Sequence, residues 1–178
     1  MDRLQRLWAP YRMSYVRGEE PGSGLGEGQE CPFCRIAAGG AGSDLVVHRG
    51  AACFVVLNLY PYNPGHLMVI PTRHVADYTE LDDVETAEVA ALTQTALQVI
   101  RTVSAPDGFN VGLNLGGVAG GSLAAHLHQH VVPRWSGDAN FMTVLGQTKT
   151  LPQLLEDTRD LLADAWPAPA RHDDPGAT

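Results

Sequence analysis

Three histidines, His126, His128 and His130, alternate with other residues along one short segment. In an extended strand successive side chains point to opposite faces, so this spacing predicts three imidazoles on one face. The apolar residues around them are typical of a strand, and the run GGVAGG before them is typical of a loop. Three imidazoles beside a loop rich in backbone N–H groups suit either a phosphate or a metal ion bound by all three. The remaining interpretation is that they are unrelated surface histidines.

The run HLHQHVV resembles the signature of the histidine triad (HIT) nucleotide-binding proteins, in which histidines alternate with apolar residues. The chain departs from that pattern at Gln129, whose side chain is expected to point away from the histidine face. The flanking runs VVPRW, GFNVGLNLG and LWAPYRMSYV resemble the bacterial diadenosine tetraphosphate phosphorylase branch of the family. The resemblance extends from about Leu7 to Trp166 and therefore covers nearly the whole chain.

The resemblance implies nucleophilic catalysis on phosphorus, for which a neutral imidazole is well suited near pH 7. It implies that His128 attacks the α-phosphorus of a dinucleoside polyphosphate and forms a nucleotidyl-histidine intermediate. Inorganic phosphate or water would then resolve that intermediate. His130 is a candidate donor to the phosphoryl oxygens. His66 matches the histidine of a Pro-Gly-His element that approaches the triad in the family.

Fixed hydrogen-bond donors around a reacting phosphate stabilise the charge of the transition state. The candidate substrate-binding residues are Asn58, Asn114, Gly120, Gly121, Ser122 and Trp135. Asn58 matches a ribose-contacting position of the relatives, and Asn114 and Trp135 match substrate-recognising positions of the phosphorylase branch. Structural alternatives remain for each: a loop cap for Asn58, strand-end or loop hydrogen bonds for Asn114 and Ser122, and plain packing for Trp135.

The pair Cys31-x-x-Cys34 has the spacing of a zinc half-site, a redox pair or a metal-free reduced pair. With His74 and His126 it resembles the zinc site of some HIT relatives and of the galactose-1-phosphate uridylyltransferases. Such a four-ligand site would be closed and structural, and it requires the cysteine segment to fold back over the end of the sheet. His126 cannot both close this site and contact phosphate freely, so zinc binding decides its role.

The elements that must position these residues alternate between strand-like and helix-like periods. We expect strands at 45–49, 51–58, 66–71, 109–115 and through the triad, a possible short strand at 141–145, and helices at 80–104 and 151–166. Strands joined by hairpin-like links with one long helix predict an α+β domain with an antiparallel sheet. Cys53 is expected in the core and His48 on the surface.

The domain limits follow from composition and from the resemblance. Residues 1–30 are expected to form an N-terminal extension and flexible linker, 31–166 the HIT domain, and 167–178 a disordered tail. The resemblance also implies a homodimer with one continuous sheet.

The 178 residues carry a net charge of −8, which argues against nucleic-acid binding by charge alone. The sequence contains no apolar run of membrane-spanning length and no signal-peptide pattern, and its three cysteines favour a reduced, cytoplasmic protein. The leading hypothesis is phosphorolysis of diadenosine tetraphosphate to ATP and ADP, with a small nucleotide and inorganic phosphate as partners. A dinucleoside polyphosphate hydrolase and a nucleoside phosphoramidase are alternatives. A nucleotide-binding module with little turnover is the alternative of another class.

Overall fold

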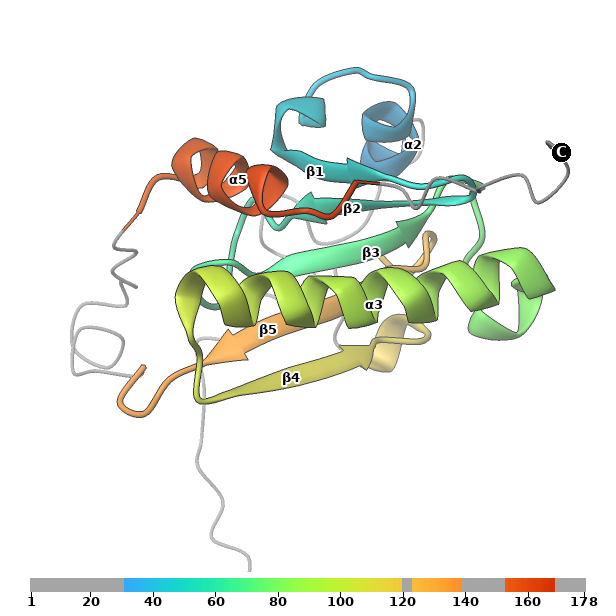
Figure 1. Cartoon of the computed structure of the whole chain (residues 1–178). Coiled ribbons are helices and arrows are strands. Elements are labelled where there is room, and N and C mark those ends of the chain that lie inside the picture. Colours follow the sequence, from blue (N-terminus) through green and yellow to red (C-terminus); the bar gives the residue numbers. More distant parts are fainter. Residues whose placement is uncertain (1–30, 120–122, 139–152, 169–178) are drawn as a thin grey trace, which may run out of the picture.

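The computed structural model describes residues 31–119, 123–138 and 153–168. The predicted N-terminal extension, the candidate donors Gly120, Gly121 and Ser122, the predicted strand 141–145 and most of the predicted tail lie outside the described residues. In chain order (Figure 1) the elements are α2 (Pro32–Ala37), β1 (Val46–Arg49), β2 (Cys53–Leu57), β3 (Leu67–Pro71), α3 (Asp83–Ser104), β4 (Gly108–Leu113), β5 (Gln129–Arg134) and α5 (Leu155–Asp164).

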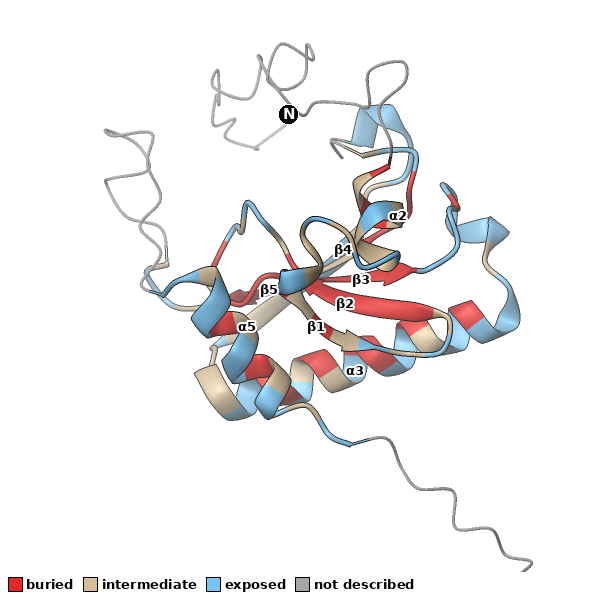
Figure 2. Ribbon diagram, turned by 90° about the horizontal axis from the view of Figure 1, so that it is seen from above, coloured by how far each residue is buried: buried red, intermediate tan, exposed pale blue. Residues whose placement is uncertain are grey.

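The five strands form one antiparallel sheet in the order β1-β2-β3-β5-β4. Figure 2 shows α3 along one face of this sheet and α2 over the opposite face. Every residue of β2 and β3 is buried, which explains why both are continuous apolar runs in the sequence. These findings confirm the predicted α+β class. No helix among the described residues is long and apolar enough to cross a membrane.

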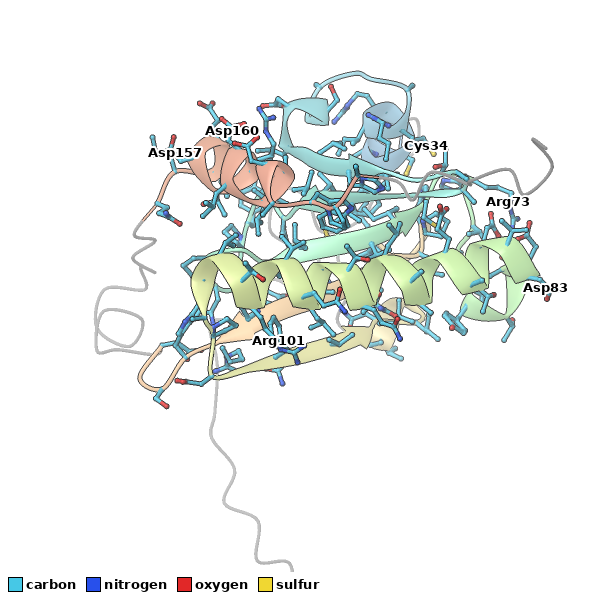
Figure 3. All side chains as sticks on the ribbon, in the orientation of Figure 1. Cys34, Arg73, Asp83, Arg101, Asp157 and Asp160 are labelled. Carbon is cyan, nitrogen blue, oxygen red and sulfur yellow. The ribbon has the colours of Figure 1, made fainter. Side chains whose placement is uncertain are left out.

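The long helix α3 begins at Asp83, three residues later than predicted, because Asp82 and Glu85 form a capping box there. Arg73, which lies beside the first turn of α3 in Figure 3, donates to the Glu85 carboxylate at 2.7 Å. The helix ends at Ser104, and the residue that follows it, Ala105, has a left-handed φ of 42°. The buried face of α3 packs against the central strands of the sheet and forms the core with them. This face includes Val89, Leu92, Ala96, Val99 and Ile100.

The triad segment differs from the predicted single strand, because β5 begins only at Gln129. His126 and His128 precede it in a segment where the Leu127 N–H donates to the Val75 carbonyl rather than to a neighbouring strand of the sheet. The Gln129 amide donates to Thr93 on α3 at 2.6 Å, which confirms that this side chain points away from His130.

Two expectations outside the triad have opposite outcomes. Cys53 is buried in the core, as predicted. His48 is not an ordinary surface residue: its ring stacks on Trp166 with 5.1 Å between centroids and 16° between planes. This stack connects β1 to the chain that follows α5.

Candidate functional site

The histidines lie around the antiparallel pairing of β3 with β5. His128 is 6% exposed and His66, which directly precedes β3, is fully buried. His130 lies inside the sheet, because it pairs with Met68 on β3 and with Gly112 on β4. The rings of His128 and His130 are 4.9 Å apart and nearly perpendicular. His130 is therefore held by two neighbouring strands, and His128 lies against it at the end of the sheet.

The tautomer of His128 follows from its hydrogen bond. Its Nδ1 lies 2.8 Å from the backbone carbonyl of His126, and a carbonyl can only accept, so Nδ1 carries the proton. The unprotonated Nε2 then presents its lone pair. Burial lowers the pKa of His128, an effect that the bond to the His126 carbonyl opposes. A neutral imidazole with a free Nε2 is the form that attacks phosphorus.

His66 and His130 form a directed chain of hydrogen bonds. The backbone N–H of Tyr62 donates to His66 Nδ1 at 3.1 Å, so a neutral His66 carries its proton on Nε2. That Nε2 lies 3.0 Å from His130 Nδ1, which must therefore accept, and His130 keeps its own proton on Nε2. Burial, and secondarily the positive charge that His128 would carry if protonated, lowers the pKa of His130 to about 4. His130 is thus a neutral donor at pH 7.

The structure places the other candidate substrate residues at different distances from this chain. The side-chain amide nitrogen of Asn114 lies 3.4 Å from His130 Nε2. Because that Nε2 carries a proton, it can donate to Asn114 only if the amide is turned so that its oxygen faces the ring. The Asn58 amide nitrogen lies 3.4 Å from His66 Nδ1, while its oxygen accepts the Tyr60 N–H in a local turn. Trp135 follows the far end of β5, where its indole donates to the Ser104 carbonyl at the end of α3.

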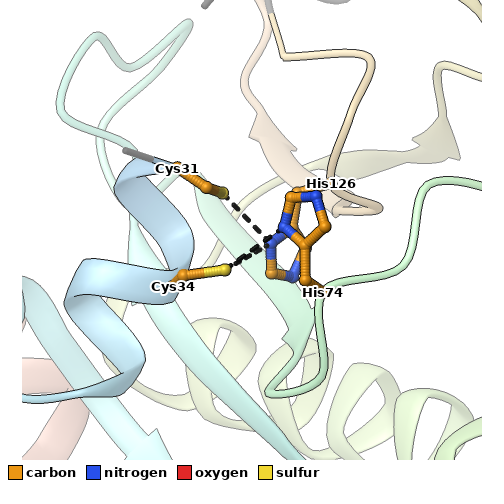
Figure 4. Close-up of side chains that lie close together, drawn as sticks. All are labelled: Cys31, Cys34, His74 and His126. Carbon is orange, nitrogen blue, oxygen red and sulfur yellow. Dashed lines mark hydrogen bonds between the residues drawn. The ribbon is translucent and has the colours of Figure 1, made fainter. Parts of the chain in front are cut away.

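Figure 4 shows the four predicted metal ligands, Cys31, Cys34, His74 and His126, side by side. Their ligand atoms all lie within 4.8 Å of one another. The Cys31 sulfur is 3.3 Å from His126 Nδ1, and the Cys34 sulfur is 3.2 Å from His74 Nδ1 and 3.6 Å from His126 Nδ1. Ligands around a tetrahedral zinc ion lie about 3.3–3.8 Å apart. The three sulfur-to-nitrogen distances are close to this range, so the four residues could hold a metal ion once the more widely separated ligand atoms move slightly closer.

The hydrogen bonds of His126 also suit a metal ligand. Its Nε2 lies 2.9 Å from the Pro71 carbonyl and must donate to it, so Nδ1 offers its lone pair toward the two sulfurs. Burial lowers the pKa of His126, which keeps the ring neutral as a ligand must be. The three triad imidazoles therefore do not share one face as predicted. His126 faces the cysteines, and His128 and His130 form the other site.

Sequence reasoning missed two residues that shape the site. Phe33, between the two cysteines, has its ring centroid 5.1 Å from that of His128 and 5.5 Å from that of His126. Tyr62 supplies the N–H that fixes His66, and its ring lies 4.8 Å from the His66 ring. The position of Phe33 inside Cys-x-x-Cys was a usable signal. Nothing in the sequence indicates the backbone donor of Tyr62.

The sheet, the alternating histidines and the Pro-Gly-His element together define a histidine triad protein. The family model described as the HIT domain matches residues 42–137, and the chain therefore belongs to the HIT family. It is 57% identical to the AP-4-A phosphorylase of Mycobacterium tuberculosis over an alignment of 169 residues, and the alignment covers 93% of this chain and 86% of that protein.

Two solved structures have the same fold. A zinc-bound histidine triad family protein from Mycobacterium smegmatis is 30% identical, with a TM-score of 0.64 over 77% of this chain and 93% of that one. A histidine triad nucleotide-binding protein from Sulfolobus tokodaii is 27% identical, with a TM-score of 0.63 over 76% of this chain and 91% of that one. The fold that carries the cysteine and histidine cluster here is therefore shared by a protein that binds zinc.

Proposed function

We propose that the protein transfers a nucleotidyl group from dinucleoside polyphosphates through His128, and that its reaction is the phosphorolysis of diadenosine tetraphosphate to ATP and ADP. The observation that carries this proposal is the hydrogen bond from His128 Nδ1 to the His126 carbonyl, which leaves Nε2 free to attack. The choice of substrate is supported by the 57% identity to an AP-4-A phosphorylase.

In the first step the lone pair of His128 Nε2 attacks one α-phosphorus, and the bond from that phosphorus to the bridging oxygen breaks. ATP leaves with the electron pair, and the adenylyl group stays on Nε2. The positive charge that develops on the ring is shared with the His126 carbonyl through Nδ1–H. The His130 Nε2–H is positioned to donate to the phosphoryl oxygens, where negative charge increases.

In the second step an oxygen of inorganic phosphate attacks the same phosphorus. The N–P bond breaks, its electrons return to His128 Nε2, and ADP leaves. If water attacks instead, AMP leaves and the enzyme is a hydrolase, while a phosphoramidate substrate would use the same nucleophile. The presence of His128 in the tautomer that attacks argues against a binding module without turnover.

We propose that Cys31, Cys34, His74 and His126 hold one structural zinc ion. Bound there, the ion would supply a crosslink between the N-terminal segment and the sheet. The fit of all four ligand atoms and the outward donation of His126 Nε2 support this proposal. Four protein ligands leave no open position for a reacting water.

The remaining expectations continue as proposals. A homodimer through a continuous sheet would use an edge strand, and β4 is an edge with exposed residues along its length. We also propose a reducing, cytoplasmic location, which the small number of cysteines and the Cys-x-x-Cys spacing support.

The decisive experiment is product analysis with diadenosine tetraphosphate, with and without inorganic phosphate. We expect ATP and ADP in equal amounts, and a rate that depends on phosphate. ATP with AMP at a phosphate-independent rate would replace phosphorolysis by hydrolysis, and absence of turnover would favour the binding module. Elemental analysis of protein purified without added metal should find about one zinc per chain.

A further inference from the structure

The nucleophile has a neighbour that is not part of the triad. Among the residues that the structure describes, the ring of His128 makes one hydrogen bond, at Nδ1, which by itself allows the ring to tilt about that bond. Two rings flank it: His130 at 4.9 Å and 81°, and Phe33 at 5.1 Å and 52°. His130 is part of the sheet, whereas Phe33 comes from α2 on the opposite face from α3 (Figure 2). The direction in which the His128 Nε2 lone pair points therefore depends partly on the position of the Phe33 ring, which α2 determines.

Helix α2 has only six residues, and the residue before it, Cys31, makes no capping hydrogen bond with its side chain. A helix this short is not stable by itself. It is fixed by tertiary contacts at both ends. Cys31 and Cys34 lie against His126 and His74, and Arg49 donates to the carbonyls of two residues in its last turn at 2.9 and 3.1 Å. Phe33, 5% exposed, is the buried residue between these anchors. Phe33 therefore lies between the cysteine and histidine cluster on one side and the Arg49 contacts on the other.

We infer that Phe33 is a positioning residue for the reaction, which holds His128 in its attacking orientation and is itself held in place by the cluster of Cys31, Cys34, His74 and His126. This inference rests on the proposed role of His128 as nucleophile. Phe33 contacts His126 edge-on at 5.5 Å, so one ring links the cluster to the reacting imidazole. A shift of the reacting atom of about 1 Å can cost 10²-fold in rate, which sets the scale of the effect.

The test uses Phe33→Leu in the full-length protein, a change that keeps an apolar side chain but removes the flat ring. Phe109→Leu is the matched control, because Phe109 lies on β4 facing Arg101 of α3, on the other side of the sheet. We expect kcat with diadenosine tetraphosphate to fall about 10- to 100-fold in Phe33→Leu, with KM changed less than threefold. Phe109→Leu should leave kcat within about threefold of the wild type.

A second readout needs neither substrate nor turnover. Nitrogen-15 NMR of the His128 ring should show one neutral tautomer, protonated at Nδ1, in the wild type and in Phe109→Leu. In Phe33→Leu and in Cys34→Ser, which removes one anchor of α2, the two ring nitrogens should report a mixture of tautomers. A wild type with one tautomer and no turnover would overturn the proposed function and, with it, the role of Phe33 in the reaction, while the tautomer comparison would still show whether Phe33 orients the His128 ring.

The positioning role itself is overturned if Phe33→Leu keeps the single tautomer and loses no more kcat than Phe109→Leu. If Phe33→Leu disturbs His128 but Cys34→Ser does not, the cluster does not hold Phe33, and that part of the inference is wrong.

Discussion

Because His130 is buried in its neutral form, the folded protein should lose stability at acid pH, and replacing this one residue should remove that part of the pH dependence. The pKa of His130 is about 4 in the folded protein, against an ordinary value of 6.5. The unfolded chain therefore binds this proton first as the pH falls, and folding stability decreases between pH 6.5 and 4. Above pH 6.5 the ring is neutral in both states and contributes no pH dependence.

The magnitude follows from the two pKa values. At pH 5 the linkage relation gives a loss of about 2 kcal/mol, and below pH 4 the loss levels off near ~3 kcal/mol. The variant His130→Asn removes this titration. It should be less stable than the wild type at pH 7, because His66 Nε2 loses its acceptor. The stability gap between wild type and variant should then narrow by about 2 kcal/mol at pH 5.

Urea unfolding at pH 7, 6 and 5 measures this gap directly. Gln129→Ala is the control: it removes a hydrogen bond to Thr93 from the next residue of β5 but adds or removes no titrating group. Its stability difference from the wild type should not change with pH. A gap for His130→Asn that also stays constant from pH 7 to pH 5 would mean that folded His130 titrates near 6.5. The description of His130 as a neutral donor would then be refuted.

Three further outcomes are expected. His128→Gly should lower turnover about 10⁴-fold or more while calorimetry still detects nucleotide binding, and an active variant would end the assignment of the nucleophile. Asn114→Ala, beside His130, and Ser122→Ala, outside the described residues, should each slow the reaction about 10²–10³-fold with an unchanged Tm. A lowered Tm with unchanged kinetics would make both structural. Glu88→Gln should cost about 2–4 kcal/mol in urea unfolding, since its carboxylate accepts the N–H groups of three residues, Ala51, Ala52 and Cys53, at 2.6–2.7 Å; a loss under about 0.5 kcal/mol would contradict it.

The metal cluster shows how far sequence spacing can go. Two cysteines separated by two residues must point to one side of a short turn, and thiolates with imidazoles suit few ions besides zinc. The two histidines came from the family resemblance, and the structure brings all four ligand atoms together. Spacing could not show the hydrogen bond that His126 Nε2 donates, because the acceptor is the backbone carbonyl of Pro71, 55 residues earlier in the chain.

The triad segment shows where periodicity stops. Alternation predicts which side chains share a face only while the chain remains in a regular strand. Before Gln129 the backbone leaves the sheet and donates from Leu127 to the Val75 carbonyl, so His126 turns toward the cysteines. The long helix and the central strands could be predicted from the sequence, because their buried side chains leave a regular apolar pattern.

The different roles of His128 and His130 arise from what each Nδ1 faces. A carbonyl at His128 Nδ1 forces the proton onto that nitrogen and leaves Nε2 as a lone pair. An N–H donor from His66 at His130 Nδ1 forces the opposite tautomer and leaves Nε2–H as a donor. Two identical side chains, two residues apart, thus adopt opposite tautomers, and His128 presents a lone pair at Nε2 where His130 presents an N–H. Since the His66 tautomer is set in turn by the Tyr62 backbone N–H, the loop before His66 determines which nitrogen of the His130 ring carries the proton.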